Sequence, residues 1–338
     1  MKTKVAINGL GRIGRAVLKL ALDETSLDVV AVNDLAASDN LAYLLRFDTV
    51  YGRLGKPVMV DENNLVVGGR KMLTLREASP VALPWKDLGV DLVFECTGAF
   101  KKRDELEQHI QAGARFVLLS APANDGDVET VVHGVNLPGA AARIISCASC
   151  TTNCITPIIE IIGRRIGIAK AIMTTVHAYT ASQATVDGPS KHFRRGRAAA
   201  ANLVPTATGA ARATTRALPE FGKLFDGVAI RVPVAVGSIA DITVVTSRRT
   251  SVDEVNRVFT EESETSRYAG IVGVSRNPLV SSDIIGESRA SIVDLELTKV
   301  VDGDLVKVMS WYDNEWGYAS QMVREAIAAT RAGEKPAA

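Results

Sequence analysis

The 338-residue sequence has few cysteines and no marked excess of charge of either sign. Lysine and arginine total 39 and aspartate and glutamate 38, whereas a dedicated nucleic-acid binder normally carries a clear basic excess. No apolar run approaches the roughly 20 residues of a membrane-spanning helix, so neither a nucleic acid nor a membrane is expected as a primary partner. The first residues pass straight into a strand and a glycine loop, and we expect no signal peptide.

Ligands for a metal ion are too few and too scattered in this sequence. A structural zinc site needs four ligands, but the histidines at 109, 133, 177 and 192 show no paired spacing. Three of the four cysteines lie in "SCASCTTNC" (146–154), one short of a ferredoxin-type cluster motif. We therefore expect no metal. These cysteines do not make a disulfide framework either, which favours a reducing cytoplasm as the location.

The first half of the chain alternates between two kinds of apolar pattern. Runs typical of buried strands occupy 4–10, 27–34, 90–98 and 114–122, and helical patterns occupy 12–24 and 102–113. Strands that alternate with helices predict a Rossmann-type, doubly wound parallel sheet. No internal repeat and no low-complexity linker interrupts the chain.

The second half is richer in strand patterns, which predict an α+β catalytic domain with a mainly antiparallel sheet. The expected strands occupy 169–180, 228–234, 240–247 and 289–313. Asp302-Gly303 indicates a hairpin turn, and Ser251 with Glu254 forms a capping box at the start of a helix. We expect an NAD-binding domain at 1–149, a catalytic domain at 150–313, and a C-terminal helix within 314–338 that packs back on the first domain.

A glycine-rich loop directly after the first strand predicts a dinucleotide site. Gly9, Gly11 and Gly14 make a G-x-G-x-x-G that opens a helix, and Asp34 ends the next strand. The glycines let the backbone approach a pyrophosphate at the helix N-terminus. Asp34 would bind the adenosine ribose hydroxyls and repel a 2′-phosphate, which favours NAD over NADP. The alternative is a tight strand–helix turn that binds no ligand.

The three clustered cysteines have different surroundings in the sequence. Cys150 falls at a strand-to-helix turn, where free N–H groups favour a thiolate. Cys154 lies one helical turn further on among isoleucines and is most simply a core residue, while the role of Cys147 stays open. A thiolate in a dinucleotide-binding protein indicates aldehyde chemistry, because addition of a nucleophile turns the aldehyde into a hydride donor. His177 is the best candidate for the base, although a lone histidine on a strand is often structural.

The motifs "INGLGRIGR", "ASCTTNC", "TTVHAYT", "RVPV" and "WYDNEWGY" occur in the order and at the spacings of a known family. The chain resembles the phosphorylating glyceraldehyde-3-phosphate dehydrogenases over nearly its whole length. The resemblance implies oxidation of D-glyceraldehyde 3-phosphate to 1,3-bisphosphoglycerate with NAD and inorganic phosphate. It also implies a hemithioacetal and an acyl thioester on Cys150, with His177 as the acid and base.

The same resemblance assigns binding roles to further residues. The cofactor would be held by Asn8, Gly9, Gly11, Arg12, Ile13, Gly14, Asp34, Ser120 and Asn314. The substrate phosphate and the attacking phosphate would be held by Ser149, Thr151, Thr180, Arg195, Thr208, Gly209 and Arg231. Residues 181–201 match the S-shaped loop at the centre of a homotetramer in this family. Leu35 and Pro189 stand where NAD-preferring members carry similar residues.

Four departures from the family pattern are visible in the sequence. Cys147 stands where asparagine is usual, Ser182 replaces an acidic residue near Thr180 and Arg231, and His192 replaces a common aspartate. The stretch 232–241 ("VPVAVGSIAD") also differs. The loss of the carboxylate at 182 puts the geometry of the substrate-phosphate site in question. These changes could tune affinity for substrate, phosphate or arsenate.

Other functions stay open at this point. An erythrose-4-phosphate dehydrogenase shares the cysteine motif, and a semialdehyde dehydrogenase shares the architecture but lacks "WYDNEWGY". The chain could also be a redox sensor in which Cys147 resolves an oxidised Cys150 as a disulfide. The basic run "KHFRRGR" (191–197) could indicate RNA binding, although it is short and the chain is nearly neutral.

Overall fold

The computed structural model describes residues 2–124 and 126–332, which form two compact units. The first unit comprises the residues up to Val131, Pro138–Ala148 and the residues from Met322 on. The second comprises Val132–Leu137 and Ser149–Gln321. The main boundaries thus fall between 148 and 149 and between 321 and 322, where the sequence suggested 149/150 and 313/314. The segment 132–137 belongs to the second unit, which the sequence did not suggest.

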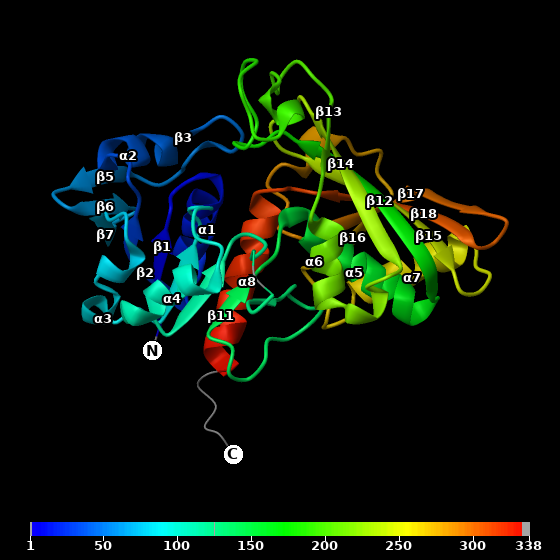
Figure 1. The fold of residues 1–338 in the computed structure, drawn as a ribbon, viewed down its shortest axis with the longest axis horizontal. Coiled ribbons are helices and arrows are strands. Elements are labelled where there is room, and N and C mark those ends of the chain that lie inside the picture. The colour runs from blue at the N-terminus through cyan, green and yellow to red at the C-terminus, as the bar shows by residue number, and fades with distance from the viewer. Residues whose placement is uncertain (1, 125, 333–338) are drawn as a thin grey trace. The chain divides into compact units, whose positions relative to one another are not determined.

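The first unit is built on a nine-stranded sheet in the order β10-β11-β9-β8-β1-β2-β7-β6-β5 (Figure 1). The pairings from β10 to β7 are all parallel, and β7, β6 and β5 continue the sheet as an antiparallel edge. The strands are β1 (Thr3–Asn8), β2 (Leu27–Asn33), β5 (Val58–Asp61), β6 (Asn64–Val67), β7 (Arg70–Leu75), β8 (Leu92–Glu95), β9 (Phe116–Leu119), β10 (Glu129–Thr130) and β11 (Ile144–Ser146). The predicted parallel, Rossmann-type sheet is confirmed.

Helices of the first unit connect these strands. They are α1 (Arg12–Asp23), α2 (Ser38–Arg46), the single turn α3 (Trp85–Leu88), α4 (Arg103–Gln111) and the 3₁₀ turn η1 (Pro80–Ala82). The strands β3 (Phe47–Asp48) and β4 (Gly52–Arg53) form a separate small hairpin. Apolar residues spaced for one helix face explain α1, whose Val17, Leu18 and Ala21 are fully buried. The parallel strands are apolar on both faces, as strands covered by crossover helices must be.

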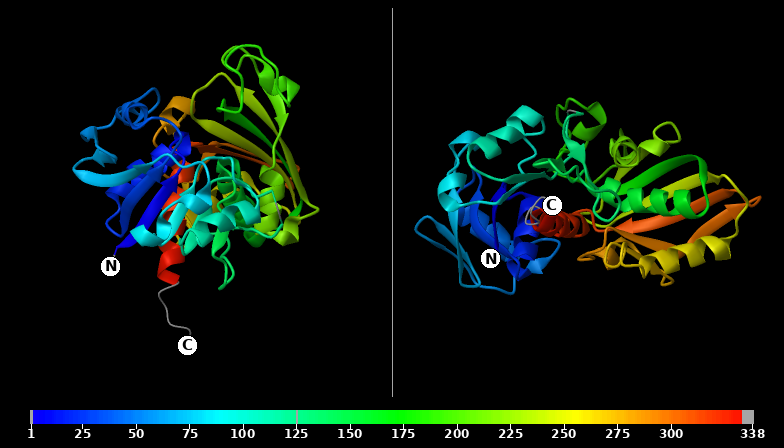
Figure 2. Two further views of the ribbon diagram at one scale, coloured as in Figure 1. Left: turned by 60° about the vertical axis from the view of Figure 1, so that its left-hand side comes forward. Right: turned by 90° about the horizontal axis from the view of Figure 1, so that it is seen from below.

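The second unit contains a seven-stranded sheet in the order β13-β14-β12-β15-β18-β17-β16. Its strands are β12 (Ile168–Ala178), β13 (Val204–Ala207), β14 (Phe225–Val232), β15 (Ser238–Thr246), β16 (Val272–Ser275), β17 (Ser291–Val301) and β18 (Leu305–Tyr312). The pairs β12–β14 and β16–β17 are parallel and the other four are antiparallel, so the expectation of a mainly antiparallel sheet is confirmed. The long β17–β18 hairpin is the orange ribbon in Figures 1 and 2. Asp302 and Gly303 both have positive φ at its turn, as predicted.

Helices α5 (Cys150–Arg165), α6 (Ala210–Ala217) and α7 (Val252–Ser263) belong to this unit. Its 3₁₀ turns are η2 (Phe193–Gly196), η3 (Pro219–Phe221) and η4 (Ser281–Ile284). The isoleucines of α5 form one buried core with the sheet and α7. Ser251 caps α7 by accepting from the Glu254 N–H, as expected. The Glu254 carboxylate, however, binds Arg248 and Thr250 rather than completing the expected capping box.

The C-terminal helix α8 runs from Trp316 to Ala332, and its residues from Met322 on belong to the first unit. None of the helices within the described residues is both long and apolar enough to cross a membrane.

Candidate active site

The glycine loop of the first unit requires glycine at two of its three glycine positions. Gly9 follows β1 with φ +93°, and a Cβ at this position would lie 2.7 Å from the Thr97 nitrogen. A Cβ on Gly14 would lie 1.9 Å from the Gly9 carbonyl oxygen, so this glycine lets α1 pack against the strand. A Cβ on Gly11, by contrast, would meet no protein atom within 4 Å. The protein itself therefore does not require glycine there, whereas a ligand against the loop would.

This loop borders a pocket of about 460 Å³ within the first unit. The lining residues are Asn8, Gly9, Gly11, Asn33, Asp34, Leu35, Glu77, Ala78, Cys96, Thr97, Ala99 and Phe100. The backbone N–H groups at the start of α1 suit a pyrophosphate, and the Asp34 carboxylate suits ribose hydroxyls. The residues present thus fit an adenine dinucleotide. Of the predicted cofactor residues, Asn8, Gly9, Gly11 and Asp34 line this pocket, while Arg12, Ile13 and Gly14 form the first turn of α1.

Asp34 is held in place by the loop that it faces. Its Oδ2 accepts from the Leu10 N–H at 2.8 Å and its Oδ1 from the Ala36 N–H at 2.9 Å. Each oxygen keeps a further lone pair for a ribose hydroxyl. The Arg12 side chain binds Asp48 at 2.7 Å, so any part it plays in pyrophosphate binding falls to its backbone.

A buried chain of polar groups supports the pocket, and sequence reasoning missed it. Glu95 is fully buried and accepts from Asn8 Nδ2 at 2.6 Å and from the Thr97 N–H at 2.8 Å. His109 Nε2 lies 3.1 Å from the same carboxylate, and its Nδ1 accepts from Trp85 Nε1. Because indole N–H only donates, the histidine proton must lie on Nε2, facing Glu95. The sequence signal was Glu95 in the apolar strand β8, since a carboxylate is rarely buried without partners.

The second unit places Cys150 at the first turn of α5. Ser149 is the N-cap, and its hydroxyl accepts from the Thr152 N–H at 3.2 Å. Cys150 Sγ lies 3.3 Å from Nε2 of His177, which is on the neighbouring strand β12. The two residues are 27 positions apart in the sequence, and the fold brings them within proton-transfer distance.

Arg231 adjoins the same imidazole from strand β14. β12 and β14 are parallel, and their register pairs His177 directly with Arg231, which puts both side chains on one face. Arg231 Nη1 contacts His177 Nδ1 and donates to the Ala178 carbonyl at 3.0 Å. His177 Nδ1 is 2.6 Å from the same carbonyl oxygen. A thiol, an imidazole and a guanidinium therefore form one contiguous group.

The electrostatics of this group differ from the sequence-based expectation of a ready thiolate. Burial raises the pKa of Cys150, and the opposing effects of Arg231, the Thr151 hydrogen bond and the helix N–H groups do not cancel it. Burial and the neighbouring Arg231 lower the pKa of His177 to about 3, with a further contribution from Arg195. At Cys150 the effect of burial on the pKa therefore exceeds that of the helix N–H groups.

Comparison with known proteins identifies the architecture. The family model for the glyceraldehyde 3-phosphate dehydrogenase NAD-binding domain matches residues 3–103, and the model for the C-terminal domain matches 149–314. The glyceraldehyde-3-phosphate dehydrogenase of Mycobacterium tuberculosis is 47% identical over 333 residues, covering 96% of this chain and 97% of its own. Glyceraldehyde-3-phosphate dehydrogenase 1 of Bacillus cereus is 44% identical over 334 residues, covering 98% and 99%.

The chain belongs to the glyceraldehyde-3-phosphate dehydrogenase family. The resemblance drawn from the five sequence motifs is thereby confirmed, and the first unit contains the family's NAD-binding domain. The chain is an NAD-dependent dehydrogenase by membership of this family. The names of these relatives give no support to the erythrose phosphate or arsenate alternatives.

The remaining residues expected from the family lie at three places in the second unit. Thr180 Oγ1 is 2.9 Å from Ser182 Oγ, so a hydroxyl stands where the family pattern has a carboxylate. Arg195 donates to Thr206 Oγ1 at 3.1 Å, next to Thr208. The Thr208 hydroxyl accepts from the Ala210 N–H, and Gly209 is the N-cap of α6 with open space around its Cα.

Asn314 and Ser120 are not among the residues that line the pocket of the first unit. Asn314 Oδ1 accepts from Ser238 Oγ at 3.0 Å and from the Gly237 N–H at 3.2 Å, which fixes the orientation of its amide. Ser238 Oγ also accepts from the Ala178 N–H, beside His177. The unusual stretch 232–241 thus supports both Asn314 and the end of β12. Ser120 follows β9 in the first unit and hydrogen-bonds the Cys96 thiol.

Tyr312 is a residue of the catalytic group that sequence reasoning did not assign. Its fully buried hydroxyl lies 2.9 Å from Thr151 Oγ1 and 2.8 Å from Thr175 Oγ1. Its ring stands edge-on to His177 with centroids 5.9 Å apart. Tyr312 therefore ties the helix of Cys150 to the strand of His177. Its position in "WYDNEWGY" was the available signal.

The other cysteines occupy different environments. Cys154 is fully buried in the core of the second unit, as predicted, and its thiol contacts Ser291. Cys147 is buried in the first unit, where burial, Glu325 and Cys96 raise its pKa. All four cysteines are free, and the disulfide between Cys147 and Cys150 stays a prediction. The described residues contain no group of three or more potential metal-ligating side chains.

Proposed function

We propose that this chain catalyses the reversible, NAD-dependent oxidative phosphorylation of D-glyceraldehyde 3-phosphate to 1,3-bisphosphoglycerate. The observation that carries the proposal is the 3.3 Å approach of Cys150 Sγ to His177 Nε2 at the N-terminus of α5. A nucleophile and a base at this distance suit covalent aldehyde chemistry. Family membership supports the substrate, since the named relatives act on glyceraldehyde 3-phosphate.

Cys150 and His177 would carry the covalent steps. Sγ bonds to the aldehyde carbon while His177 passes the thiol proton to the carbonyl oxygen, which gives a hemithioacetal. NAD supplies a hydride acceptor when bound. His177 Nε2 takes the hydroxyl proton as the thioester forms on Cys150. Inorganic phosphate then displaces Sγ, and the proton returns from His177 to the departing sulfur.

Binding roles follow from the chemistry of the neighbouring groups. Arg231 and Thr180 would hold the substrate phosphate, because a guanidinium and a hydroxyl suit a dianion. The attacking phosphate would be bound by Ser149, Thr151, Arg195, Thr208 and Gly209, which offer hydroxyls, one cation and two helix N-termini. Asn8, Gly9, Gly11, Arg12, Ile13, Gly14 and Asp34 would bind the adenosine and pyrophosphate. Ser120 and Asn314 would serve the nicotinamide.

An NADH-formation assay tests this proposal directly. We expect activity with glyceraldehyde 3-phosphate that depends on inorganic phosphate, and its loss in Cys150→Ser. Arsenate in place of phosphate and erythrose 4-phosphate in place of the triose serve as comparisons. NADH formation that needs no oxyanion, or a higher kcat/KM for erythrose 4-phosphate, would contradict the assignment.

We also propose the assembly, location and domain roles that the family suggests. Residues 1–149 would form the NAD-binding domain and 150–313 the catalytic domain, with the C-terminal helix packing on the former. The assignment of residues from Met322 on to the first unit supports this arrangement. Phe193 is 89% exposed in the segment 181–201, which supports a role of this segment in a homotetramer. Four free cysteines support a reducing cytoplasm.

A further inference from the structure

The buried polar chain behind the dinucleotide pocket has a fixed hydrogen-bond direction. Its outer end is the Trp85 indole N–H, which can only donate and does so to Nδ1 of His109 at 3.0 Å. The histidine proton therefore lies on Nε2, which donates to Glu95 Oε2 at 3.1 Å. Asn8 Nδ2 donates to the same oxygen at 2.6 Å. Trp85, His109 and Glu95 are fully buried, so bulk water does not compete for these hydrogen bonds.

The chain continues from Glu95 to the wall of the pocket. Because Asn8 Nδ2 donates to Glu95, Asn8 Oδ1 is left to accept from Asn33 Nδ2 at 2.7 Å. Asn33 exchanges two hydrogen bonds with the Glu77 backbone, accepting from its N–H and donating to its carbonyl, both at 2.9 Å. Asn8, Asn33 and Glu77 all line the pocket. The buried carboxylate is thus linked, through two amides, to the backbone of the pocket wall.

Thr97 forms a second branch on the other carboxylate oxygen. Its N–H donates to Glu95 Oε1 at 2.8 Å, and its hydroxyl donates to the same oxygen. The Thr97 hydroxyl also accepts from the Ala99 N–H at 3.1 Å, and Thr97 and Ala99 both line the pocket. Two donors on each oxygen use the roughly four lone-pair sites of an ionised carboxylate. Glu95 therefore accepts on every side and donates nothing.

Only a group that accepts on every side fits this position. In Glu95→Gln the side-chain carbonyl must stay with the Thr97 N–H, so the amide NH₂ faces the NH₂ group of Asn8. The Asn8 amide then has to rotate, which sets its Nδ2 against Nδ2 of Asn33. Asn33 cannot rotate in turn, because its Oδ1 is held by the Glu77 N–H. A buried donor without an acceptor costs free energy, so we expect the pocket wall at Asn33 and Glu77 to shift.

We propose that Glu95 and His109 are positioning residues for NAD, which hold the pocket wall in the arrangement that binds its adenosine half. This inference rests on the proposed placement of NAD in this pocket. Neither Glu95 nor His109 is among the residues that line the pocket, so each acts through other side chains. Asp34, the proposed ribose contact, directly follows Asn33 in the chain, so a shift of Asn33 displaces the ribose site as well.

Binding of ADP-ribose to the full chain, measured by calorimetry, tests the proposal without relying on turnover. Glu95→Gln keeps the size of the side chain and should raise the Kd for ADP-ribose by about 10-fold, because it leaves a buried donor unmatched. In the NADH-formation assay it should raise KM for NAD to a similar extent, while kcat at saturating NAD changes by less than about twofold.

Asp91→Asn is the matched control for this substitution. Asp91 directly precedes the same strand β8, accepts from the Lys4 N–H at 3.0 Å, and is not among the residues that line the pocket. It makes the same change from carboxylate to amide in the same unit. Its Kd for ADP-ribose should stay within about twofold of the original value.

Two substitutions of His109 test the direction of the chain. His109→Gln offers an amide that accepts from Trp85 and donates to Glu95, as the imidazole does, and should retain ADP-ribose binding. His109→Leu offers neither group and should raise the Kd. Equal Kd values for these two variants would show that hydrogen bonding by His109 plays no part in positioning. If circular dichroism shows that Glu95→Gln does not fold, the two His109 variants decide the proposal.

The outcomes separate this inference from the proposed function. An unchanged Kd in Glu95→Gln, an equal rise in Asp91→Asn, or a fall in kcat with an unchanged KM for NAD would overturn this inference alone. If the unmodified protein does not bind ADP-ribose, the inference fails together with the proposed cofactor site. The NADH-formation assay on the unmodified protein decides independently whether the proposed reaction occurs.

Discussion

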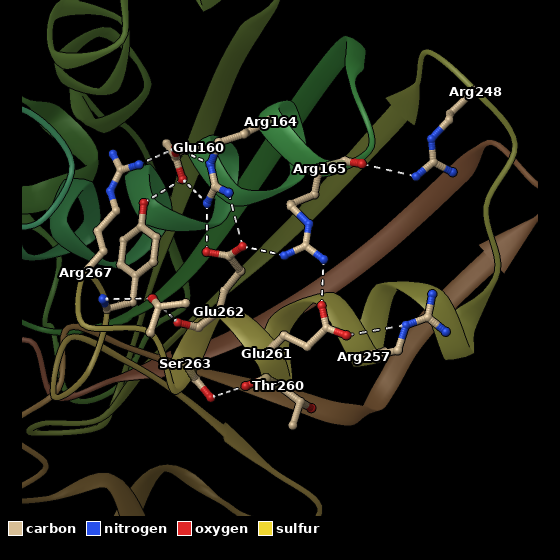
Figure 3. Close-up of polar contacts among 12 residues, drawn as sticks. Glu160, Arg164, Arg165, Arg248, Arg257, Thr260, Glu261, Glu262, Ser263 and Arg267 are labelled. Atoms are coloured by element: carbon tan, nitrogen blue, oxygen red, sulfur yellow. Dashed lines mark hydrogen bonds and ion pairs between the residues drawn. The ribbon is translucent and has the colours of Figure 1, made fainter.

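The two ends of helix α5 carry charge in opposite ways. At its C-terminal end, Arg164 and Arg165 bind Glu262 at 2.7 and 2.6 Å (Figure 3). Glu160, one turn back, binds Arg164 and Arg267. At its N-terminal end Cys150 and His177 face two arginines, Arg231 and Arg195, and no carboxylate among residues 2–124 and 126–332 pairs with either arginine. At the C-terminal end of α5, arginines and glutamates are paired with one another. At the N-terminal end, the two arginines have no acidic partner among the described residues.

The charged residues at the two ends of α5 therefore have different roles, one in stabilising the fold and the other in substrate binding. The cations at the C-terminal end already have their anions, and they complement the helix dipole while they join α5 to α7. The cations at the N-terminal end have backbone and hydroxyl partners but no counter-charge from the part of the chain that the structure describes, so they are available to an anionic substrate. A half-buried charge without a counter-charge costs free energy, and such charges are found where a ligand supplies the opposite charge.

Replacement of the nucleophile Cys150 should have the largest effect on activity. It should leave the ion pairs at the C-terminal end of α5 unaffected. Cys150→Ser is expected to lower kcat by at least about 10³-fold, because a buried hydroxyl is a far weaker nucleophile than a thiolate. Stopped-flow measurement of NADH formation checks this, with circular dichroism melting as a control for folding. Substantial turnover in the serine variant would rule out the thioester route.

Removal of the positive charge of Arg231 should weaken substrate binding. Arg231→Gln is expected to raise KM for glyceraldehyde 3-phosphate by about 10–100-fold, since a charge-assisted contact to phosphate contributes about 1.5–3 kcal/mol. Steady-state kinetics measure this, and the unphosphorylated aldehyde serves as the control substrate. Its KM should stay nearly unchanged. An equal loss for both substrates would show that Arg231 does not bind the phosphate.

Sequence reasoning predicted the pairing of Cys150 with His177 but not the charges that surround it. The local signals were strong for Gly9, Gly11, Asp34 and Cys150, because a glycine loop and a strand-to-helix turn have short-range signatures. The contact of His177 with Arg231 depends on the parallel register of β12 and β14, strands separated by some 50 residues, and no local pattern encodes it.

Burial also reversed one expectation. The helix N-terminus predicted a lowered thiol pKa at Cys150, but removal of the group from water has the larger effect and raises it. Desolvation depends on everything that packs around a residue, which a sequence window does not contain. For the same reason, sequence reasoning did not assign roles to Glu95 and Tyr312, because their hydrogen-bond partners come from elements distant in the sequence.

At the paired end of α5, loss of one anion should cost stability rather than activity. Glu262→Gln leaves Arg164 and Arg165 without their shared carboxylate, and we expect a loss of about 2 kcal/mol in the free energy of unfolding. This value is reduced for the partial exposure of both arginines. The matched control is Asp302→Asn, which breaks the exposed pair with Arg249 and should cost less than about 0.5 kcal/mol. Urea unfolding compares the two, and equal losses would contradict the distinction between them.

The pH dependence of the free energy of unfolding should show whether the imidazole of His177, at the N-terminal end of α5, is neutral in the folded protein. The pKa of His177 is about 3 in the folded protein and about 6.5 in the unfolded chain, so the unfolded state binds more protons between these values. Stability should therefore fall as the pH drops below 6.5, by about 1.4 kcal/mol per pH unit from this residue. His177→Asn should flatten the slope of unfolding free energy between about pH 6 and 5. Identical slopes in both proteins would show that His177 is protonated when folded.

The smallest effect is expected from placing an acidic side chain close to the proposed substrate-phosphate site. Ser182 lies 2.9 Å from Thr180, so Ser182→Asp would place a negative charge beside the proposed phosphate contact. Repulsion of the dianion, and competition for Arg231, should raise KM several-fold while kcat changes little, because this exposed position is partly screened by solvent. Ser182→Asn, similar in size but uncharged, should behave like the original protein, and the Asp effect should shrink in high salt. If Asn and Asp raise KM equally, the effect is steric, and the absence of a carboxylate at 182 is not what leaves the arginine free for substrate.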